Sequence, residues 1–487
     1  MNFDTTYLQL PSRFYTKLPP TPVANPGPIR VNRQLAAQLG FDAVWLSSPE
    51  GTEVLAGNRL AVGSEPIATV YAGHQFGGWS PQLGDGRAIL LGEVVGRDGV
   101  RYDVQLKGSG RTPYSRGGDG RAPLGPVLRE YMVSEAMAAF GVPTTRSLAA
   151  VTTGETVYRE VPEPGAVLTR VAQSHIRIGT FQFFLARQDF EGLRLLTDYV
   201  IERHYPAAAE AENPALALYE AVIAGQASLL AQWQLLGFIH GVMNTDNMLL
   251  SGETIDYGPC AFMDTYHPET VYSSIDHQGR YAYRNQPGIA QWNLACLAQT
   301  LLPLIDEDQD QARERAQESL DVFPSLYQGA YRQGMASKLG LRALEPDDDG
   351  LAIDLLELMA KEKMDFTLVF RRLADLAHAG NGQGVKELFD FPPEFSAWLK
   401  RWRQFIDQDS GDPADRQAAM YRANPAFIPR NHLVAEAIDH AVNDEDFGPF
   451  NTLVDLLEQQ RNFDPALAKY ATPPRPEQVV SKTFCGT

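Results

Sequence analysis

Residues 240–250 read HGVMNTDNMLL, and residues 255–259 read IDYGP. The first stretch follows the apolar residues 214–241 (PALALYEAVIAGQASLLAQWQLLGFIHG), which predict a long helix running directly into it. Asn247 supplies a neutral oxygen ligand and Asp256 an anionic one. Hard oxygen donors of this kind are the ligands that Mg²⁺ prefers, so both residues are predicted metal ligands.

The two stretches have the outline of the catalytic loop and the metal-binding turn of a protein kinase. In the kinase pattern H-R-D-x-x-x-x-N, the catalytic aspartate stands five residues before the asparagine. Counting back five from Asn247 gives Val242. An aliphatic side chain can neither orient nor deprotonate a hydroxyl, so ordinary phosphoryl transfer lacks its base, although Asp246 is available next to Asn247.

Glycine punctuates residues 71–126, where a nucleotide-binding turn would be expected. Residues 88–95 (AILLGEVV) and 100–107 (VRYDVQLK) flank GRDG, which predicts two antiparallel strands joined by an Asp-Gly turn. QLGDGRA opens this hairpin, and Gly84 and Gly86 would let the backbone approach a phosphate. The third glycine of G-x-G-x-x-G is lacking, so a plain tight turn remains the alternative.

Lys107 ends the second of these strands, in an apolar setting that favours a positioned cation. Residues 123–141 (PLGPVLREYMVSEAMAAFG) predict a helix, with a proline-containing start and a terminal glycine. On that helix Glu130 stands at a plausible distance for the lysine–glutamate ion pair of kinases. Glu135 competes for the role but points to a different face. The alternative for Lys107 is a strand-end lysine whose charge reaches solvent.

The order of elements predicts an α+β chain on the bilobal plan of a protein kinase. Residues 156–172 (TVYREVPEPGAVLTRVA) predict another hairpin around Pro-Glu-Pro-Gly, and the patterns turn largely helical from about residue 180 to about 460. The predicted divisions are an N-terminal extension (1–70, with a helix near 32–41), a strand-rich N-lobe with the glycine-rich loop (71–179), a large helical C-lobe (180–460) and a C-terminal tail (461–487).

The charge of the chain is strongly acidic, with a formal net charge of −18 over 487 residues. This balance argues against nucleic acid or an anionic membrane as partner, because both need a basic face. Residues 97–187 instead carry 12 Lys and Arg against 8 Asp and Glu, so an anion site is expected there. Within it, Arg170 and Arg177 could each fork onto phosphate oxygens, although a surface salt bridge is the alternative for either.

Three cysteines, Cys260, Cys296 and Cys485, cannot make a disulfide framework, which fits a reducing compartment. The N-terminus resembles neither a secretory signal nor a transit peptide, and no apolar stretch of about 18 residues is evident, so a cytoplasmic location is predicted. The sequence contains no G-x-x-x-x-G-K-[ST] loop, no H-E-x-x-H, no C-x-x-C and no G-x-S-x-G motif. His74 and His240 are expected to be hydrogen-bonded structural residues.

Several long motifs together resemble the selenoprotein O family over essentially the whole chain. They are YAGHQFG (71–77), LGDGR (83–87), VQLKGSGRTPYSRGGDGRA (104–122), HGVMNTDNM (240–248), IDYGPCAFMD (255–264) and NPAFIPRNH (424–432). The resemblance implies a pseudokinase fold that binds ATP in a flipped orientation. It also implies transfer of AMP to Ser, Thr or Tyr hydroxyls of protein substrates, with release of pyrophosphate. Val242 would then be tolerated because a different phosphorus is attacked.

The same resemblance implies roles for individual residues. Asp246 would be the base for the acceptor hydroxyl, and Asn247 and Asp256 would hold Mg²⁺ or Mn²⁺; use of UTP with manganese stays open. The nucleotide site would comprise Gly84, Gly86, Arg87, Lys107 with Glu130 behind it, Asp119, Gly120, Arg170, Arg177 and Asp256.

One departure from the family concerns the C-terminus, where some members carry selenocysteine and this chain has Cys485. We hypothesise a reversible Cys260–Cys485 disulfide, against two separate thiols. Two other functions remain as alternatives: a kinase that uses Asp246 as its base, and a catalytically silent ATP-binding scaffold. The position of a label on ATP separates them, since only nucleotidyl transfer moves the α-phosphate.

Overall fold

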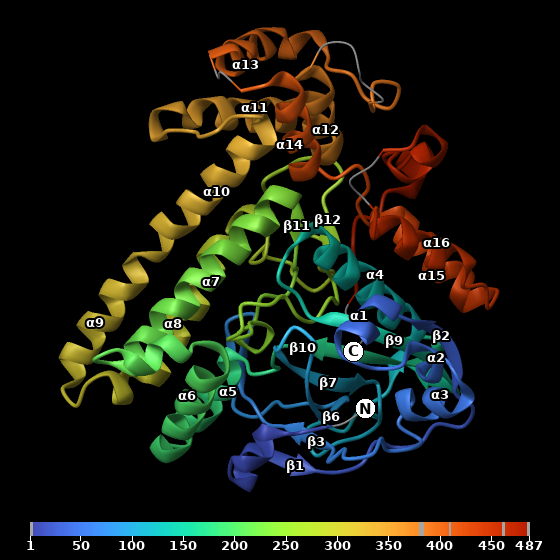
Figure 1. Ribbon diagram of the computed structural model, residues 1–487, viewed down its shortest axis with the longest axis vertical. Coiled ribbons are helices and arrows are strands. Elements are labelled where there is room, and N and C mark those ends of the chain that lie inside the picture. The colour runs from blue at the N-terminus through green and yellow to red at the C-terminus, as the bar shows by residue number, and fades with distance from the viewer. Residues whose placement is uncertain (1–2, 379–383, 409–410, 460–462, 485–487) are drawn as a thin grey trace.

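The protein is described by a computed structural model that covers residues 3–378, 384–408, 411–459 and 463–484. It is a mixed α/β structure in which a sheet-rich N-terminal part precedes a helical C-terminal part, as predicted. Figure 1 shows the sheet at the bottom of the view and the long helices above and beside it.

The principal sheet has eight strands, and every pairing in it is antiparallel. Its order is β1-β3-β6-β7-β10-β9-β2, with the short β8 paired to β10. The strands are β1 (Tyr15–Lys17), β2 (Gly27–Val31), β3 (Ile67–Thr69), β6 (Ala88–Val95), β7 (Arg101–Lys107), β8 (Ala122–Pro123), β9 (Arg146–Tyr158) and β10 (Pro162–Ala172).

Helices cover both faces of this sheet. Because strand side chains alternate between the faces, neighbouring residues of β10 contact different helices. Leu168 packs with α4 (Leu124–Phe140), and α15 (Asn431–Asn443) and α16 (Gly448–Leu457) pack on the far side of α4. Its neighbour Val167 belongs instead to a cluster with α1 (Arg33–Gln38), α2 (Ala43–Leu46) and α3 (Pro49–Leu55). The helices of the first 70 residues thus pack on one face of the sheet, and the helices near residue 450 pack on α4, which covers the other face.

Two predicted local features are confirmed, and one is displaced. The β6–β7 hairpin and helix α4, which ends at Gly141 with φ 84°, lie where the sequence placed them. The β9–β10 hairpin exists, but the prediction that it turns around Pro-Glu-Pro-Gly is wrong, because Pro162 pairs with Tyr158. The turn comes earlier, at residues 159–161, and the Pro-Glu-Pro-Gly residues instead enter β10, where a register shift falls between Pro164 and Ala166.

The helical part is built around α7, which Asn213 caps by accepting from the Leu216 N–H and which Gly237 ends at φ 70°. Helix α7 packs against α8 and α10 and delivers the chain to the stretch at residue 240, as predicted (Figure 1). The helices are α5 (Ile178–Leu185), α6 (Phe190–His204), α7 (Pro214–Leu236), α8 (Gln286–Ile305), α9 (Gln309–Asp321), α10 (Phe323–Leu339), α11 (Asp349–Lys361), α12 (Phe366–Leu376), α13 (Ser396–Gln408) and α14 (Pro413–Ala423).

Two helical segments, Pro214–Leu236 and Tyr283–Ile305, are long and apolar enough by length and composition to cross a membrane, so the prediction that no such stretch exists is wrong. About half of each apolar window is buried in the protein (56% and 50%). Core helices of soluble proteins pass the same test, so the two segments are weak evidence for a membrane span.

A buried polar layer joins the sheet to α6. Arg203 donates to Asp103 at 2.6 Å, and the nearby Glu253 accepts from the Gln173 N–H at 3.0 Å and from the Ser251 hydroxyl at 2.8 Å. Burial raises the pKa of Glu253 to about 8. This carboxyl group therefore binds a proton in the folded protein at pH values where the unfolded chain has released it.

We expect this group to make the protein less stable as pH rises from about 4.5 to about 8. The native state then binds more protons than the unfolded state, which costs about 5 kcal/mol of unfolding free energy across that interval. Glu253→Gln keeps the shape and removes the titration, so its melting temperature should fall much less between pH 5 and pH 8. The exposed Glu50→Gln should behave like the wild type, and an unchanged pH slope in Glu253→Gln would contradict the assignment.

Candidate active site

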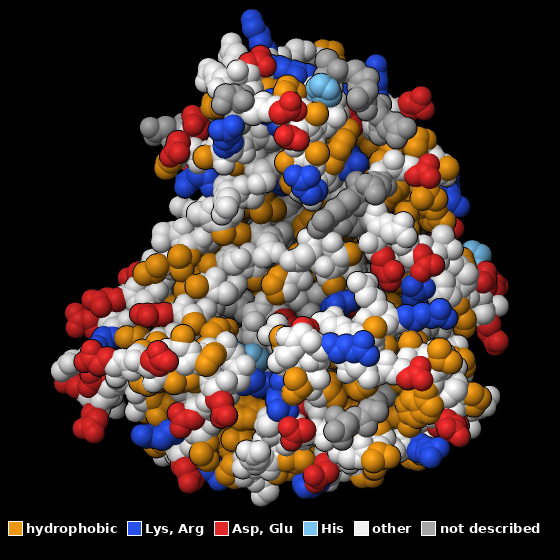
Figure 2. Space-filling model, viewed as in Figure 1, with side chains coloured by type: hydrophobic (Ala, Val, Ile, Leu, Met, Phe, Trp, Pro, Cys, Tyr) orange, Lys and Arg blue, Asp and Glu red, His pale blue; other side chains and the backbone are white. Residues whose placement is uncertain are grey.

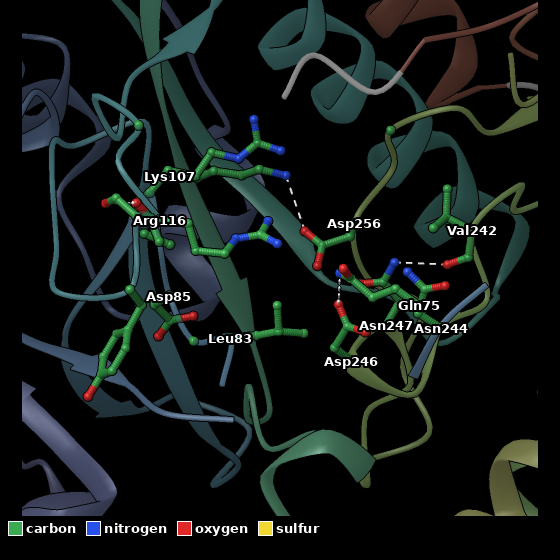
Figure 3. A pocket seen from close by; sticks show the side chains of 18 of the residues that line it. Gln75, Leu83, Asp85, Lys107, Arg116, Val242, Asn244, Asp246, Asn247 and Asp256 are labelled. Carbon is green, nitrogen blue, oxygen red and sulfur yellow. Dashed lines mark hydrogen bonds and ion pairs between the residues drawn. The ribbon is translucent and has the colours of Figure 1, made fainter. Parts of the chain in front are cut away.

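A cavity of about 910 Å³ opens between the sheet and the 240–259 segment. Figure 3 shows its walls: Asp85, Lys107 and Arg116 on the sheet side, and Asp246, Asn247 and Asp256 on the other. Every predicted site residue except Glu130 lines this cavity, namely Gly84, Gly86, Arg87, Lys107, Asp119, Gly120, Arg170, Arg177, Asp246, Asn247 and Asp256. The structure thus brings together groups that the sequence scatters over more than 170 positions.

An ion cluster forms the centre of the site. Lys107 Nζ lies 2.5 Å from Glu130 Oε2 on α4, so the predicted lysine–glutamate pair is present. The competitor Glu135 instead accepts from Arg146 at 2.7 Å and from Asn32 at 2.7 Å, away from the cavity. The strand-end position of Lys107 and the helix face of Glu130 therefore meet as their spacing predicted.

Three cations converge on the carboxylate of Asp256. Its Oδ1 accepts from Lys107 at 3.2 Å and from Arg170 at 2.6 Å, and its Oδ2 accepts from Arg177 at 2.7 Å. Burial alone would raise the pKa of Asp256, but the three cations hold that pKa well below its usual value. Asp256 also has φ 63°, a left-handed conformation that is uncommon outside glycine.

Hydrogen bonds fix the loop around Asn247 and the histidines beside it. Asn247 Nδ2 donates to the Val242 carbonyl at 2.8 Å, which leaves its amide oxygen for another partner. His240 Nε2 bonds the Ile255 carbonyl at 2.8 Å, and His74 Nδ1 bonds Gln182 at 2.9 Å. Both histidines are thus hydrogen-bonded structural residues, as predicted.

Asp246 has one carboxylate oxygen in use and one without a partner. Gln75 Nε2 donates to Oδ2 at 3.1 Å, whereas Oδ1 is buried and makes no hydrogen bond to any described residue. Burial raises the pKa of Asp246 to about 6, partly offset by Arg177, which also donates to the Asp246 backbone carbonyl at 2.5 Å. A carboxylate with a free, buried oxygen beside a cavity is equipped to accept a proton.

A divalent metal fits the residues on this side of the cavity. Asn247 offers an amide oxygen and Asp256 a carboxylate, and both line the cavity. This all-oxygen set suits Mg²⁺ or Mn²⁺ and lacks the nitrogen and sulfur ligands of zinc sites. Among the described residues no group of three or more His, Cys, Asp or Glu side chains is placed to hold a metal ion.

The glycine-rich turn is closely packed. A Cβ built on Gly84, at φ 123°, would lie 2.5 Å from the Tyr114 ring, and one on Gly120, at φ 70°, would lie 2.0 Å from the Gly110 carbonyl. Asp119 is held by Arg159 at 2.9 Å. These glycines are therefore required by the fold of the turn itself, and the turn also forms one wall of the cavity.

The family profile described as "Protein adenylyltransferase SelO" matches residues 1–458. The chain belongs to the SelO family. It is 60% identical over 486 residues to the protein nucleotidyltransferase YdiU of Rhodopseudomonas palustris strain BisB5, covering 100% of this chain and 99% of the relative. It is also 57% identical over 485 residues to that of Bradyrhizobium sp. strain ORS 278 (100% and 99%) and 57% identical over 486 residues to that of Rhizobium etli (100% and 97%). The recognition of the family and of a nucleotidyltransferase from the sequence is confirmed.

Three cavity residues of this SelO-family chain received no role from the sequence. Arg116 points into the cavity (Figure 3), has φ 50° and makes no hydrogen bond or ion pair to a described residue. Asp85, between the two glycines of LGDGR, accepts from Thr69 through Oδ2. Gln75 holds Asp246. Arg116, Asp85 and Gln75 lie inside the quoted motifs, so the signal was present, but no spacing rule distinguishes them.

The proposed link between Cys260 and Cys485 stays a prediction, because Cys485 lies outside the described residues. Cys260 is fully buried. Thr483, two residues before Cys485, donates to the carbonyl of Pro259, the residue before Cys260, at 2.6 Å. The described end of the tail therefore runs beside the segment that follows Asp256.

Proposed function

We propose that this SelO-family chain is a protein adenylyltransferase, which transfers AMP from ATP to Ser, Thr or Tyr hydroxyls of protein substrates. The observation that supports the proposal is a cluster of cations and carboxylates in the cavity, together with an inert residue at the position where the kinase pattern has its base. Lys107, Glu130 and Asp256 form one ion cluster, while Val242 stands where a kinase has its aspartate. Asp246 also lines the cavity, and its Oδ1 has no hydrogen-bond partner among the described residues.

The bilobal, kinase-like plan and its boundaries at residues 70, 179 and 460 form part of this proposal. It is supported by the order of a strand hairpin ending in Lys107, a helix carrying Glu130, and a helix that leads into the metal-binding loop. The N-lobe would include the glycine-rich turn with Gly84, Gly86 and Arg87.

ATP would bind in the flipped orientation with its α-phosphate near Asn247 and Asp256. Lys107, Arg170 and Arg177 then form a cationic wall for the β- and γ-phosphates, and Arg116 adds a further cation from the glycine-rich side. Asp119 and Gly120 would contact the nucleotide from the neighbouring turn. A bound Mg²⁺ or Mn²⁺, held by Asn247 and Asp256, would neutralise charge on the phosphates.

Asp246 would perform the proton transfer. The acceptor hydroxyl oxygen forms a bond to the α-phosphorus, and its proton passes to Asp246. The bond from that phosphorus to the bridging oxygen breaks, and the electron pair leaves with pyrophosphate. Gln75 orients the carboxylate, and Arg177 fixes the Asp246 backbone through the carbonyl.

The test uses ATP labelled on the α- or the γ-phosphate, with Mg²⁺, the purified protein and a mixture of candidate acceptor proteins. We expect only the α-label to become covalently bound, with an intact-mass gain of one AMP. Transfer of the γ-label alone would make the protein a kinase that uses Asp246. Nucleotide binding without any transfer would favour a silent scaffold.

A further inference from the structure

A strip of aromatic side chains leads from Asp246 to the protein surface. It is formed by the turn of β4 (Gly73–Gln75) and β5 (Gly78–Ser80) together with residues before and within α8. The centroids of neighbouring rings along it are separated by 4.8 to 5.4 Å. The exception is the step from Tyr281 to Trp292, where the side chain of Arg280 lies over both rings. We call this strip the aromatic rim; in order from the cavity, it comprises Phe76, Tyr281, Arg280, Trp292, His74 and Trp79.

The rim is continuous with the proposed acceptor site. Gln75, which holds Asp246, immediately precedes Phe76, and the Phe76 N–H donates to Asn244 Oδ1 at 3.0 Å. Phe76 and Ile275 both line the cavity at this end. A polypeptide whose hydroxyl reaches Asp246 from outside would therefore pass over the rim.

The rim exposes apolar side chains that a protein normally covers. Trp79 is 42% exposed, Trp292 is 37% exposed, and Ile275 at the cavity edge is 55% exposed. Large aromatic side chains beside a site, ringed by polar residues, are typical anchors for a polypeptide partner.

Arg280 supplies an uncompensated positive charge in the middle of the rim. Its guanidinium carbon lies 4.9 Å from the Trp292 ring centroid, and a Cβ built on Gly77 would lie 3.6 Å from the same carbon. Its Nε is buried without a hydrogen-bond partner, and no carboxylate of the described residues forms an ion pair with it. Its backbone N–H, by contrast, is held by Asp276 at 2.9 Å.

The surroundings make this charge unusual for the protein. Arg284, four residues later, pairs with Glu269 at 2.6 Å. The chain carries a net charge of −18, and Figure 2 shows acidic side chains gathered over α9 at the left of the view. A cation held between rings and left without a carboxylate is prepared for one from a partner, because a carboxylate can accept a forked pair of bonds from a guanidinium.

We infer that the aromatic rim binds the acceptor polypeptide and that Arg280 selects segments with an acidic side chain close to the acceptor hydroxyl. This inference rests on the proposed function and names the class of substrate that the site takes. The apolar faces of Trp79 and Trp292 bind the chain beside that acidic residue, and Arg280 fixes its register relative to Asp246.

The test uses synthetic peptides that carry one serine each and differ only at the flanking positions, which hold Asp and Glu, Asn and Gln, or Lys. Binding is measured by calorimetry with the protein saturated by α,β-methylene ATP, and transfer is measured with α-labelled ATP. We expect the wild type to bind the acidic peptides about tenfold more tightly than the amide peptides. Arg280→Gln should lose this preference, and Arg280→Glu should prefer the lysine peptides.

Arg284→Glu is the matched control, since it changes an arginine of the same segment that already has a partner, and it should keep the wild-type preference. The affinity for the ATP analogue should be unchanged in all variants. An Arg280-dependent preference in binding without transfer of the α-label would overturn the proposed function but leave the docking site. Peptide transfer without charge preference, or no peptide binding at all, would overturn the docking site.

Discussion

Asp256→Asn should lower the rate of AMP transfer by more than about 10³-fold, because it removes both a metal ligand and the anion on which three cations converge. Lys107 and Arg170 would then share only the carboxylate of Glu130, and Arg177 would keep only its bond to the Asp246 backbone carbonyl. Breaking a buried ion pair in this way also costs about 3 kcal/mol of unfolding free energy. Rates are measured with α-labelled ATP under single-turnover conditions, at a temperature well below the melting point of the variant.

Metal removal separates the two roles of Asp256. In the presence of a chelator, the wild type should lose AMP transfer. Under the same conditions, Asp256→Asn should bind metal-free ATP at least as tightly as the wild type does, because the three cations that contacted Asp256 can then contact the phosphates. Weaker metal-free binding by the variant would contradict the view that Asp256 and the phosphates share these cations. A variant that transfers AMP at the wild-type rate would remove Asp256 from the site.

Asp264→Asn is the matched control for the loss of stability. Asp264 accepts from the buried Arg430 at 2.8 Å and lies outside the cavity. It should lower the melting temperature as Asp256→Asn does, but leave the transfer rate within about twofold of wild type. A large loss of transfer in this control would mean that instability alone explains the effect of Asp256→Asn.

Much of the site could be predicted because its elements are locally encoded. The β6–β7 hairpin follows from an Asp-Gly turn between apolar strands, and α4 ends at Gly141 in the left-handed conformation that glycine favours. Once a strand end and a helix face are fixed, Lys107 and Glu130 can meet. The long motifs supplied the family and the remaining roles.

What the sequence did not reveal depends on contacts between distant positions. Gln75 and Asp246 are 171 residues apart in the sequence, and no local sequence pattern predicts their hydrogen bond. The turn at residues 159–161 was missed for a different reason, since Pro-Glu-Pro-Gly is a strong turn signal that strand pairing overrides. Arg280 received no role from the sequence, because only the structure shows that no carboxylate of the described residues pairs with it.

Asp246→Asn should lower the transfer rate by about 10²- to 10⁴-fold while leaving the affinity for ATP within about twofold of the wild type. The amide keeps the size of the carboxylate, and its oxygen can still accept from Gln75 Nε2. What it cannot do is take the proton of the acceptor hydroxyl. The loss should therefore fall on kcat, with nucleotide affinity measured separately by calorimetry with α,β-methylene ATP.

Glu253→Gln provides the comparison for Asp246→Asn, because Glu253 is also a buried carboxyl whose pKa is raised by burial, yet it lies outside the cavity. If replacing any buried carboxyl disturbed the enzyme, both variants would lose transfer equally. We expect Glu253→Gln to retain it. A fully active Asp246→Asn would exclude Asp246 as the base, whereas equal loss of ATP binding and transfer would assign it to the nucleotide site instead.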